Sequence, residues 1–416
     1  MSYILIWCIT GCAIAGVLFR PNDWPEAVWA CLGAGLLVAF GLLPASQAAG
    51  AVGKGIDVYL FLTGMMLLAE LARREGVFHW LALLAVSAAK GSPTRLFTLV
   101  YIVGVGVTIF LSNDATAVVL TPAVYAAVKR AKAEALPYLL ICAFIANAAS
   151  FVLPISNPAN LVVYGKQLPA LAEWLRTFLL PSLCSIAATY VALRCLARKE
   201  LARQIERATE RAALSVPGKR ALWGILLTAG ILTAASAFNL DLGLPTCVAA
   251  ILAVLVTTRA DTGALRQVTA GVSWSVLPLV AGLFVLVEAL NQVGAQAEVG
   301  HFLEACAGMP GLAGSLAASF GSAGLSNLMN NLPSGLLVGA AVQATQVPTQ
   351  IRNSVLIGVD LGPNLSVTGS LATVLWLIAL RREGVAITGW RFLQAGAVVM
   401  PPALLLATIA GWWITH

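Results

Sequence analysis

The sequence predicts an all-α integral membrane protein with an inverted repeat, about ten transmembrane helices, two re-entrant hairpins and two broken helices. Of its 416 residues, 59% are hydrophobic and only 10% are charged, and the mean hydropathy is +0.88. Soluble domains carry about 25% charged residues, so nearly all of this chain is expected in lipid. Long apolar stretches indicate helical spans, because the strands of a membrane barrel would alternate apolar and polar residues.

Apolar runs bounded by charged or turn residues mark the expected membrane spans. Simple spans are expected at 3–19, 27–44, 56–72, 177–194, 221–238, 243–258, 273–291 and 392–414. Two more, 136–164 and 354–380, contain Pro and Asn in mid-run and are expected to be broken. Segments 95–130 and 311–346 each have two short apolar arms around an Asn-rich tip. We interpret both as re-entrant hairpins, which are tolerated only where protein or a cavity surrounds the tip.

The two halves of the chain carry related marks in the same order. An interval of 218 residues separates Gly64 from Gly282, Glu70 from Glu288 and Gly76 from Gly294. A hairpin and a broken span follow in each half, and we match Asn160 with Asn364. Each half has an odd number of spans, so the second half is expected to be inverted. The predicted units are a first repeat over 1–194, a cytoplasmic basic linker over 195–220 and a second repeat over 221–416.

The basic residues predict the orientation. If the linker is cytoplasmic, all of the 25 Lys and Arg residues lie at cytoplasmic ends except Lys54, Lys166, Arg176 and Arg352. This asymmetry fits the positive-inside rule. Basic residues flank the first hairpin, which is expected to enter from the cytoplasm. Residues 267–351 contain no Lys or Arg, so the second hairpin is expected to enter from outside, and both chain termini are expected to be external.

Small and amide residues at the tips and breaks are the candidate site. Unwound helix ends expose free N–H and C=O groups, and Asn and Ser side chains add donors and acceptors. A secondary transporter uses such paired breaks to bind its cargo near mid-membrane. The candidate substrate-binding residues are Ser112, Asn113, Asn157, Asn160, Ser326, Asn327, Asn330, Asn331 and Asn364. The alternative is that these side chains only cap broken helices, and the two roles can coexist.

Two acids in these segments are candidates for proton coupling. Asp114 is the only carboxylate in the first tip, and Asp360 lies at the second break. A carboxylate at membrane depth is costly to ionise and is a functional candidate for that reason. The alternative for Asp360 is an N-cap of the half-helix that follows. Glu70 and Glu288 lie near span ends, where snorkelling or a structural hydrogen bond is the more ordinary role.

Other residue patterns exclude several classes of protein. The eight cysteines form no CxxC pair, so neither a disulfide framework nor a zinc site is expected. The net charge of +7 is explained by loop charges that orient the protein, and no nucleic-acid partner is expected. The sequence has neither HExxH nor a paired-Asp motif, so we expect no enzyme activity, no metal and no cofactor.

Four motifs resemble one known family. The first tip reads SND followed by LTP, the first break SNPAN, the second tip NNLP and the second break DLGPN. Together they resemble the arsenite efflux pump family, the arsenical pump membrane proteins of the ion transporter superfamily, over essentially the whole chain. A symmetric SNT pair, typical of sodium-coupled relatives, is absent, and an Asp stands in the first tip. This departure favours proton coupling.

The resemblance implies a function and partners. Such proteins export trivalent arsenite, and often antimonite, across the cytoplasmic (inner) membrane in exchange for protons. Some members also work with a cytoplasmic ATPase subunit, for which the 194–220 loop is the candidate docking face. That loop could equally contact anionic lipid of the bilayer or be a solvated linker.

Rival functions stay open at this point. A sodium/proton antiporter of the same architecture would use the same two Asp residues. An organic-anion transporter is disfavoured because the breaks contain neither Lys nor Arg. A passive channel is disfavoured because tips entering from opposite sides indicate alternating access.

Overall fold

The computed structural model describes residues 2–165, 168–206 and 213–415, and every regular element in these ranges is a helix. The first half contains α1 (Ser2–Phe19), α2 (Glu26–Ala39), α3 (Ala45–Lys54), α4 (Ile56–Arg74), α5 (Val77–Ala89), α6 (Pro93–Phe110), α7 (Asn113–Ala115), η2 (Thr116–Leu120), α8 (Thr121–Arg130), α9 (Leu136–Ala148), η3 (Pro154–Ser156), α10 (Pro158–Tyr164) and α11 (Leu171–Leu196). After the linker come α12 (Val216–Ala237), α13 (Gly243–Thr258), α14 (Thr262–Gly271), α15 (Val276–Gln292), α16 (Ala295–Ala307), α17 (Leu312–Met329), α18 (Asn331–Ala344), α19 (Thr349–Leu361), η6 (Gly362–Asn364), η7 (Val367–Gly369), α20 (Leu371–Arg382) and α21 (Gly389–Thr415).

The helix lengths suit a multi-pass membrane protein. Five helical stretches of the described chain are long and apolar enough to cross a bilayer: Pro93–Phe110, Leu171–Leu196, Val216–Ala237, Thr262–Gln292 and Gly389–Thr415. A sixth is the pair α3 and α4, which is bent by 49°. Other predicted spans are shorter apolar helices, such as α1, α2 and α13, or are interrupted. The predicted all-α membrane fold is confirmed.

Two helices that the sequence did not predict follow the repeated glycines. Gly76 and Gly294 have φ values of 75° and 86°, a left-handed backbone that glycine adopts without strain. Each glycine turns the chain out of a long helix, α4 or α15, and into a shorter one, α5 or α16. The matched glycines Gly76 and Gly294 therefore occupy the same structural position, between a long helix and a shorter one.

Both segments predicted as hairpins consist of two helical arms joined at a break. After α6 the chain is fully extended at Ser112, and after α17 Asn330 has φ 77° and ψ 151°. The arms are also joined by side chains: the Thr108 and Thr116 hydroxyls lie 2.8 Å apart, and the Ser326 hydroxyl donates to that of Ser334 at 3.3 Å. Each pair spans eight residues. The first and second pairs are 218 residues apart, which supports the predicted internal repeat.

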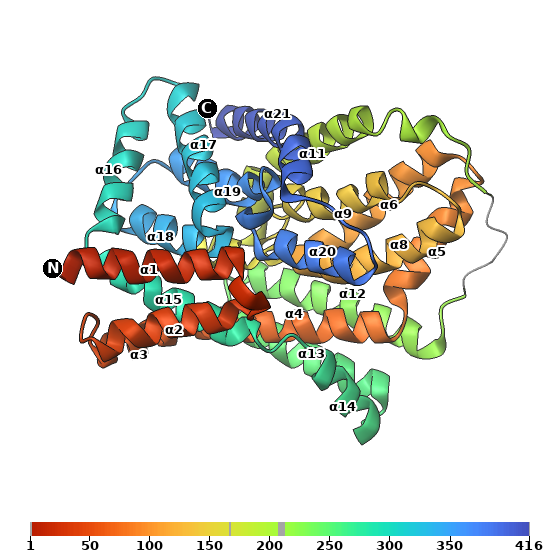
Figure 1. Cartoon of the computed structure of the whole chain (residues 1–416), viewed down its shortest axis with the longest axis horizontal. Coiled ribbons are helices and arrows are strands. Elements are labelled where there is room, and N and C mark those ends of the chain that lie inside the picture. The colour runs from red at the N-terminus through yellow and green to blue at the C-terminus, as the bar shows by residue number, and fades with distance from the viewer. Residues whose placement is uncertain (1, 166–167, 207–212, 416) are drawn as a thin grey trace.

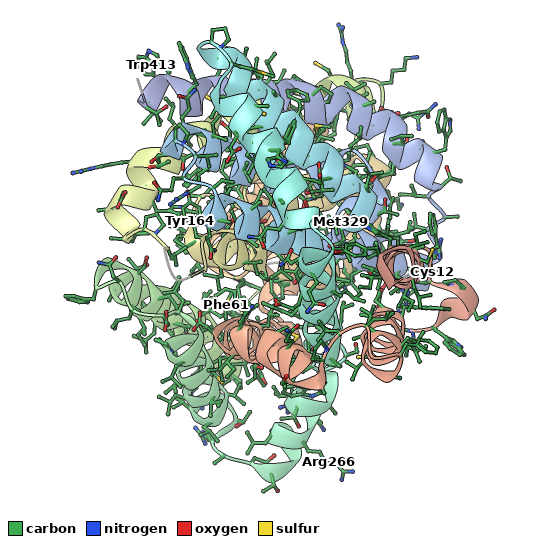
Figure 2. All side chains as sticks on the ribbon, turned by 90° about the vertical axis from the view of Figure 1, so that its left-hand side faces the viewer. Cys12, Phe61, Tyr164, Arg266, Met329 and Trp413 are labelled. Carbon is green, nitrogen blue, oxygen red and sulfur yellow. The ribbon has the colours of Figure 1, made fainter. Side chains whose placement is uncertain are left out.

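The two hairpins lie toward opposite ends of the molecule (Figure 1). Most long helices run roughly along the horizontal axis of the view; α17 and α18 lie to the left, and α6 and α8 to the right. Both labelled chain ends lie toward the left, and the chain that follows α11, up to residue 206, lies at the right. Seen from the left-hand side, Met329, which precedes the second tip, projects near the middle of the molecule (Figure 2).

Close helix packing holds the second hairpin against the second broken span. A Cβ at Gly358 of α19 would collide with the Ser319 carbonyl and the Ser322 hydroxyl of α17. We therefore expect Gly358→Ala to destabilise the protein by about 1–3 kcal/mol, seen as a lower melting temperature in detergent. Gly324→Ala, on the exposed side of α17 where a Cβ meets open space, is the matched control and should not destabilise. Equal melting temperatures for the two variants would contradict this packing.

Candidate functional site

The first tip places one carboxylate against a cavity. Ser112 caps α7 by accepting a hydrogen bond from the Ala115 N–H at 3.1 Å, and the Asn113 side chain accepts from the Asp114 N–H at 2.9 Å. These bonds hold the tip, so Asn113 is a local cap. The half-buried carboxylate of Asp114 accepts no hydrogen bond from any residue that the structure describes. Asp114 is therefore held by its backbone while its carboxylate stays unpaired.

The cavity at this tip has a volume of about 660 Å³. It is lined by α4, α5, the first tip, η2, α8, Pro158, residues 271–276 and α20. Most of its wall is apolar, with side chains such as Phe61, Met65 and Val118. Its ionisable side chains are Glu70, Arg73, His79, Asp114, Arg382 and Glu383. Because Arg73, Arg382 and Glu383 are exposed at helix ends, the cavity connects the molecular surface to the first tip.

The first break is held together by two of the predicted amides. Asn157 caps α10 by accepting from the Ala159 N–H at 3.0 Å. Asn160 donates to the carbonyl oxygens of Ser150, Leu153 and Pro154 at 2.9, 3.3 and 3.3 Å. Both amides thus stabilise the unwound chain, which is the role that the alternative interpretation of these residues gave them. The Asn160 Oδ1 atom is buried and has no hydrogen-bond partner in the structure.

A fully buried polar cluster joins the two breaks. The Asp360 carboxylate accepts from the Asn157 amide at 2.9 Å and contacts the Ser150 hydroxyl at 2.7 Å. The Ser150 hydroxyl also lies 2.7 Å from the Asn147 carbonyl oxygen. The Asn147 amide donates to Asn364 Oδ1 at 3.0 Å. Residues of the two halves are therefore hydrogen-bonded to each other at the place where both chains unwind.

The Ser150 hydroxyl constrains the proton on Asp360. A hydroxyl carries a single hydrogen, and both oxygens near it, the Asn147 carbonyl and Asp360 Oδ2, are acceptors when Asp360 is ionised. If Asp360 carries a second hydrogen, both 2.7 Å contacts can be full hydrogen bonds at the same time; otherwise the two acceptors share one hydrogen. The geometry of the cluster thus fits a neutral Asp360.

The second tip is tied to the second break in its own half. Asn327 donates to the carbonyl oxygens of Ala323 and Gly362, both at 2.8 Å, and accepts from the Ser366 hydroxyl at 2.5 Å. Asn330 donates to the Thr368 carbonyl at 3.4 Å. Ser326 and Asn331 are buried beside this tip. This cluster is separate from the cavity, because none of its described residues lines it.

The predicted residues therefore fall into three groups. Ser112 and Asp114 line the cavity, and Asn157, Asp360 and Asn364 belong to the buried cluster between the breaks. Hydrogen bonds of Asn113, Asn160, Ser326, Asn327 and Asn330 hold the tips and the first break, and Asn331 is buried beside the second tip. The expectation that all of them line one pocket is not met in this conformation.

The alternative role considered for Asp360 and the match of Asn160 with Asn364 are both wrong. Asp360 does not cap the following half-helix, because it lies inside α19 and Ser370 caps α20. Asn160 and Asn364 are not equivalent, because Asn160 lies within α10 whereas Asn364 precedes α20.

Sequence reasoning missed Asn147 and Ser150. Asn147 is a single amide in an otherwise apolar helix, and Ser150 follows the end of that helix. An uncompensated amide in an apolar run was the available signal, since buried polar groups need partners. The partners, Asn364 and Asp360, are more than two hundred residues away along the chain.

The two repeated glutamates form ion pairs. Glu70 accepts two hydrogen bonds from Arg73, at 2.5 and 2.6 Å, and Glu288 pairs with Lys54 at 2.9 Å. Both are structural contacts near helix ends, as the sequence indicated.

Comparisons with known proteins identify the family of this chain. Residues 6–380 match the family described as "CitMHS: Citrate transporter". The chain belongs to this family. An "Arsenical pump membrane protein" of Escherichia coli is 28% identical over 366 residues, 83% of each chain, and a second E. coli protein of that name is 27% identical over 414 residues, 95% of each. An "uncharacterized transporter" of Mycobacterium tuberculosis is 24% identical over 411 residues, 96% of each chain.

A solved structure has the same fold. The YdaH transporter of Alcanivorax borkumensis superimposes with a TM-score of 0.57 at 15% identity, covering 94% of this chain and 97% of that one. The family match and the apolar helices make the protein a multi-pass helical membrane transporter.

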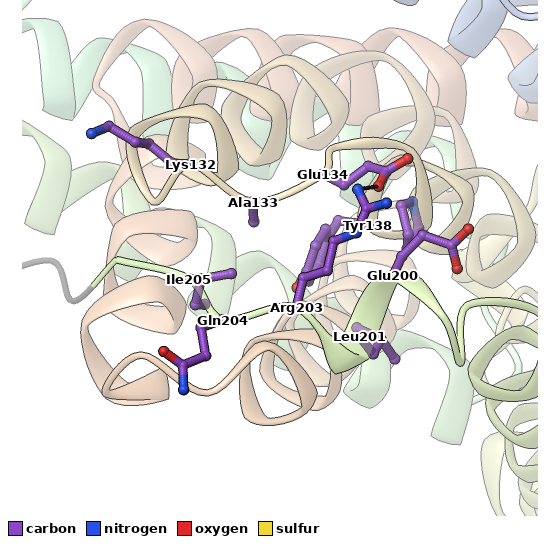
Figure 3. A pocket seen from close by; sticks show the side chains of 10 residues that line it. Lys132, Ala133, Glu134, Tyr138, Glu200, Leu201, Arg203, Gln204 and Ile205 are labelled. Atoms are coloured by element: carbon purple, nitrogen blue, oxygen red, sulfur yellow. Dashed lines mark hydrogen bonds and ion pairs between the residues drawn. The ribbon is translucent and has the colours of Figure 1, made fainter.

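Residues 203–206 of the linker form ion pairs and a hydrogen bond with residues 131–134, which directly follow the first hairpin (Figure 3). Arg203 pairs with Glu134 at 3.0 Å, Lys132 pairs with Glu206 at 2.6 Å, and the Glu206 N–H donates to the Ala131 carbonyl at 3.0 Å. A small cavity of about 130 Å³ lies between the two segments. Residues 207–212 of the predicted 194–220 docking loop lie outside the described residues.

Proposed function

We propose that this transporter exports trivalent arsenite, and antimonite by the same chemistry, through proton antiport and alternating access. The observation that carries the proposal is the unpaired Asp114 carboxylate, which faces a solvent-connected cavity next to a broken helix. A group in this position can gain and lose a proton as the protein cycles. The cargo is inferred from relatives that cover 83–95% of the chain and carry the name arsenical pump membrane protein.

The chemistry of the tips suits a small neutral cargo. Arsenious acid is an uncharged molecule with three OH groups near pH 7, and Ser hydroxyls, Asn amides and free backbone groups can hydrogen-bond to all of them. Near the first tip the cavity offers Ser112 and Asp114, while its arginines lie at exposed helix ends. An acid beside the binding position disfavours anionic cargo, which would ordinarily require a nearby cation.

Proton antiport supplies enough free energy for export. A neutral cargo cannot be driven by voltage alone. One proton entering per exported molecule yields about 2.3 kcal/mol per 100 mV. Since about 1.4 kcal/mol corresponds to a tenfold ratio, this supports roughly a 50-fold concentration difference of arsenite.

The two acids differ in their access to solvent, and we assign them different roles. Asp114 lines the cavity and its carboxylate accepts no hydrogen bond from the described residues, so it is the proposed carrier of the coupling proton. Asp360 is fully buried, contacts Ser150 and Asn157, and is not part of the cavity wall. We propose that Asp360 keeps its proton and holds the two breaks together.

The proposed orientation places the cavity mouth in the cytoplasm. The mouth carries Arg73 and Arg382, and the positive-inside rule assigns such residues to the cytoplasmic side of the inner membrane. Both termini are then external, and the first hairpin opens from the cytoplasm. A cytoplasmic ATPase subunit that bound the 194–220 loop would contact a segment already fastened to this hairpin through Arg203 and Lys132.

The first test is rescue of an arsenite-sensitive host, followed by uptake into everted membrane vesicles. We expect expression to restore growth on arsenite, and vesicle uptake to rise with an inside-acid gradient and to collapse with a protonophore. Arsenite uptake at the same rate with and without the pH gradient would contradict proton coupling. Sodium flux without arsenite flux would instead identify a sodium/proton antiporter.

A second candidate cargo follows from the family description. The matched family is described as a citrate transporter, and Arg73 and Arg382 at the cavity mouth could attract an organic anion. Against this, Arg73 is already paired with Glu70. Uptake of labelled citrate into the same vesicles distinguishes the two candidate cargoes. We expect no proton-dependent citrate uptake and no competition by citrate with arsenite.

A further inference from the structure

The proposed carrier Asp114 needs a route for its proton. The cavity reaches from the exposed ends of α4 and α20 to the first tip, and most of the wall between them is apolar. Apolar side chains cannot pass a proton along, so water and the few polar and ionisable side chains of the wall must do so. The chemistry of those side chains narrows the choice.

Four of the other five ionisable groups in the cavity are poor proton relays. Glu70 accepts two hydrogen bonds from Arg73 at 2.5 and 2.6 Å, so both of its carboxylate oxygens already have a partner. Arg73 and Arg382 remain protonated under all ordinary conditions. Glu383 is exposed at the end of α20, in contact with bulk solvent.

His79 is the remaining group. It is half-buried on α5, lines the same cavity as Asp114, and forms no hydrogen bond or ion pair with any described residue. A histidine side chain can both accept and donate a proton between about pH 5 and 8. His79 therefore has the free ring nitrogens, the location and the chemistry that a relay requires.

Helix α5 also connects His79 to the moving part of the proposed cycle. It packs against α8 and η2, which follow Asp114 in the first hairpin, and against α4, α6 and α12. The charged residues of these neighbouring helices that are absent from the cavity wall are Asp57, Arg74, Arg95, Lys129, Arg130, Lys219 and Arg220. Asp114 belongs to the hairpin, whereas His79 lies on α5, outside it. Motion of the hairpin relative to α5 would change the separation of His79 and Asp114.

We propose that His79 is the proton relay that loads and unloads Asp114. On loading, the imidazolium N–H gives its proton through cavity water to the Asp114 carboxylate, and the neutral imidazole is reprotonated from the solvent at the cavity mouth. On unloading, the same transfers run in reverse. Each transfer breaks one N–H or O–H bond and forms another, with no further reactant. The assignment depends on the proposed role of Asp114.

The transport test uses His79→Ala in everted vesicles. We expect the initial rate of proton-driven arsenite uptake to fall about fivefold or more, with unchanged arsenite affinity. Imidazole added to the medium should restore the rate, because the cavity is large enough to admit it. His301→Ala, an exposed histidine on α16, is the matched control and should transport as the wild type. A wild-type rate and pH profile in His79→Ala, or a loss that imidazole does not restore, would overturn the relay.

A second measurement is independent of arsenite. Time-resolved infrared spectroscopy after a pH jump follows the carbonyl band of protonated Asp114, assigned by its absence in Asp114→Asn. His79→Ala and the bulkier His79→Gln should both slow the appearance of this band. If both His79 variants slow the protonation of Asp114 but the wild type does not transport arsenite, the relay is supported and the proposed cargo is rejected. Protonation at the wild-type rate in both variants would reject the relay whatever the cargo is.

Discussion

Replacing Asp114 with Asn is expected to abolish uphill arsenite transport, with a loss on the order of 100-fold or more, while leaving the protein folded. Asn has nearly the same shape but cannot ionise, so it carries no proton. The tip itself is held by Ser112 and Asn113, whose hydrogen bonds to Ala115 and to the backbone of residue 114 do not involve this carboxylate. The variant should therefore bind cargo without coupling it to protons.

The measurement separates coupling from binding. In everted vesicles the Asp114→Asn variant should show no response to an inside-acid gradient, whereas arsenite-for-arsenite exchange without a gradient should persist. Asp114→Glu, which keeps a carboxylate, should retain part of the coupling. Glu298→Gln, an exposed acid on α16, controls for loss of one negative charge. Gradient-driven uptake by Asp114→Asn near the wild-type rate would remove Asp114 from the proton pathway.

The positions of the two hairpin tips could be predicted from the sequence for a physical reason. A cluster of Asn, Ser and Pro in an apolar run cannot remain a regular helix in lipid without leaving backbone groups unpaired. The structure breaks the chain at Ser112 and Asn330, inside the two predicted tips. Local composition is sufficient to predict these breaks, because the residues that interrupt each helix lie at the break itself.

The pairing between the halves could not be predicted in the same way. Matching Asn160 with Asn364 by residue type failed, because capping and not residue identity determines where each second half-helix begins. Asn157 caps α10, and Ser370 caps α20 with Thr373 completing a capping box.

The buried cluster shows a deeper limit of sequence analysis. Asp360 is recognisable as an acid in a membrane segment, but its two partners, Ser150 and Asn157, come from the other half of the chain. Tertiary contacts alone determine whether such an acid faces a cavity or is buried among hydrogen-bond partners. The sequence therefore offered two candidate proton carriers, Asp114 and Asp360, and could not show that only one of them borders a cavity.

This difference leads to the second large effect, at Asp360. If Asp360 is a neutral hydrogen-bonding group, Asp360→Asn can replace it closely: its amide N–H donates to Ser150, and its amide oxygen accepts from Asn157. We expect that variant to remain folded and proton-coupled. Asp360→Ala instead leaves the Asn157 amide buried without an acceptor and Ser150 without its second contact. Each unsatisfied buried group costs about 1–3 kcal/mol, so Asp360→Ala should melt at a clearly lower temperature and accumulate poorly in the membrane.

Comparison of the two variants with Asp114→Asn tests the division of roles. Melting curves of detergent-purified protein report stability, and vesicle uptake with and without a pH gradient reports coupling. We expect Asp360→Asn to resemble the wild type in both measurements and Asp114→Asn to differ only in coupling. If Asp360→Asn were stable but uncoupled, Asp360 would have to release its proton during transport. The hydrogen bonds from the first break would then have to open in each cycle, since a sealed carboxyl group cannot exchange with solvent.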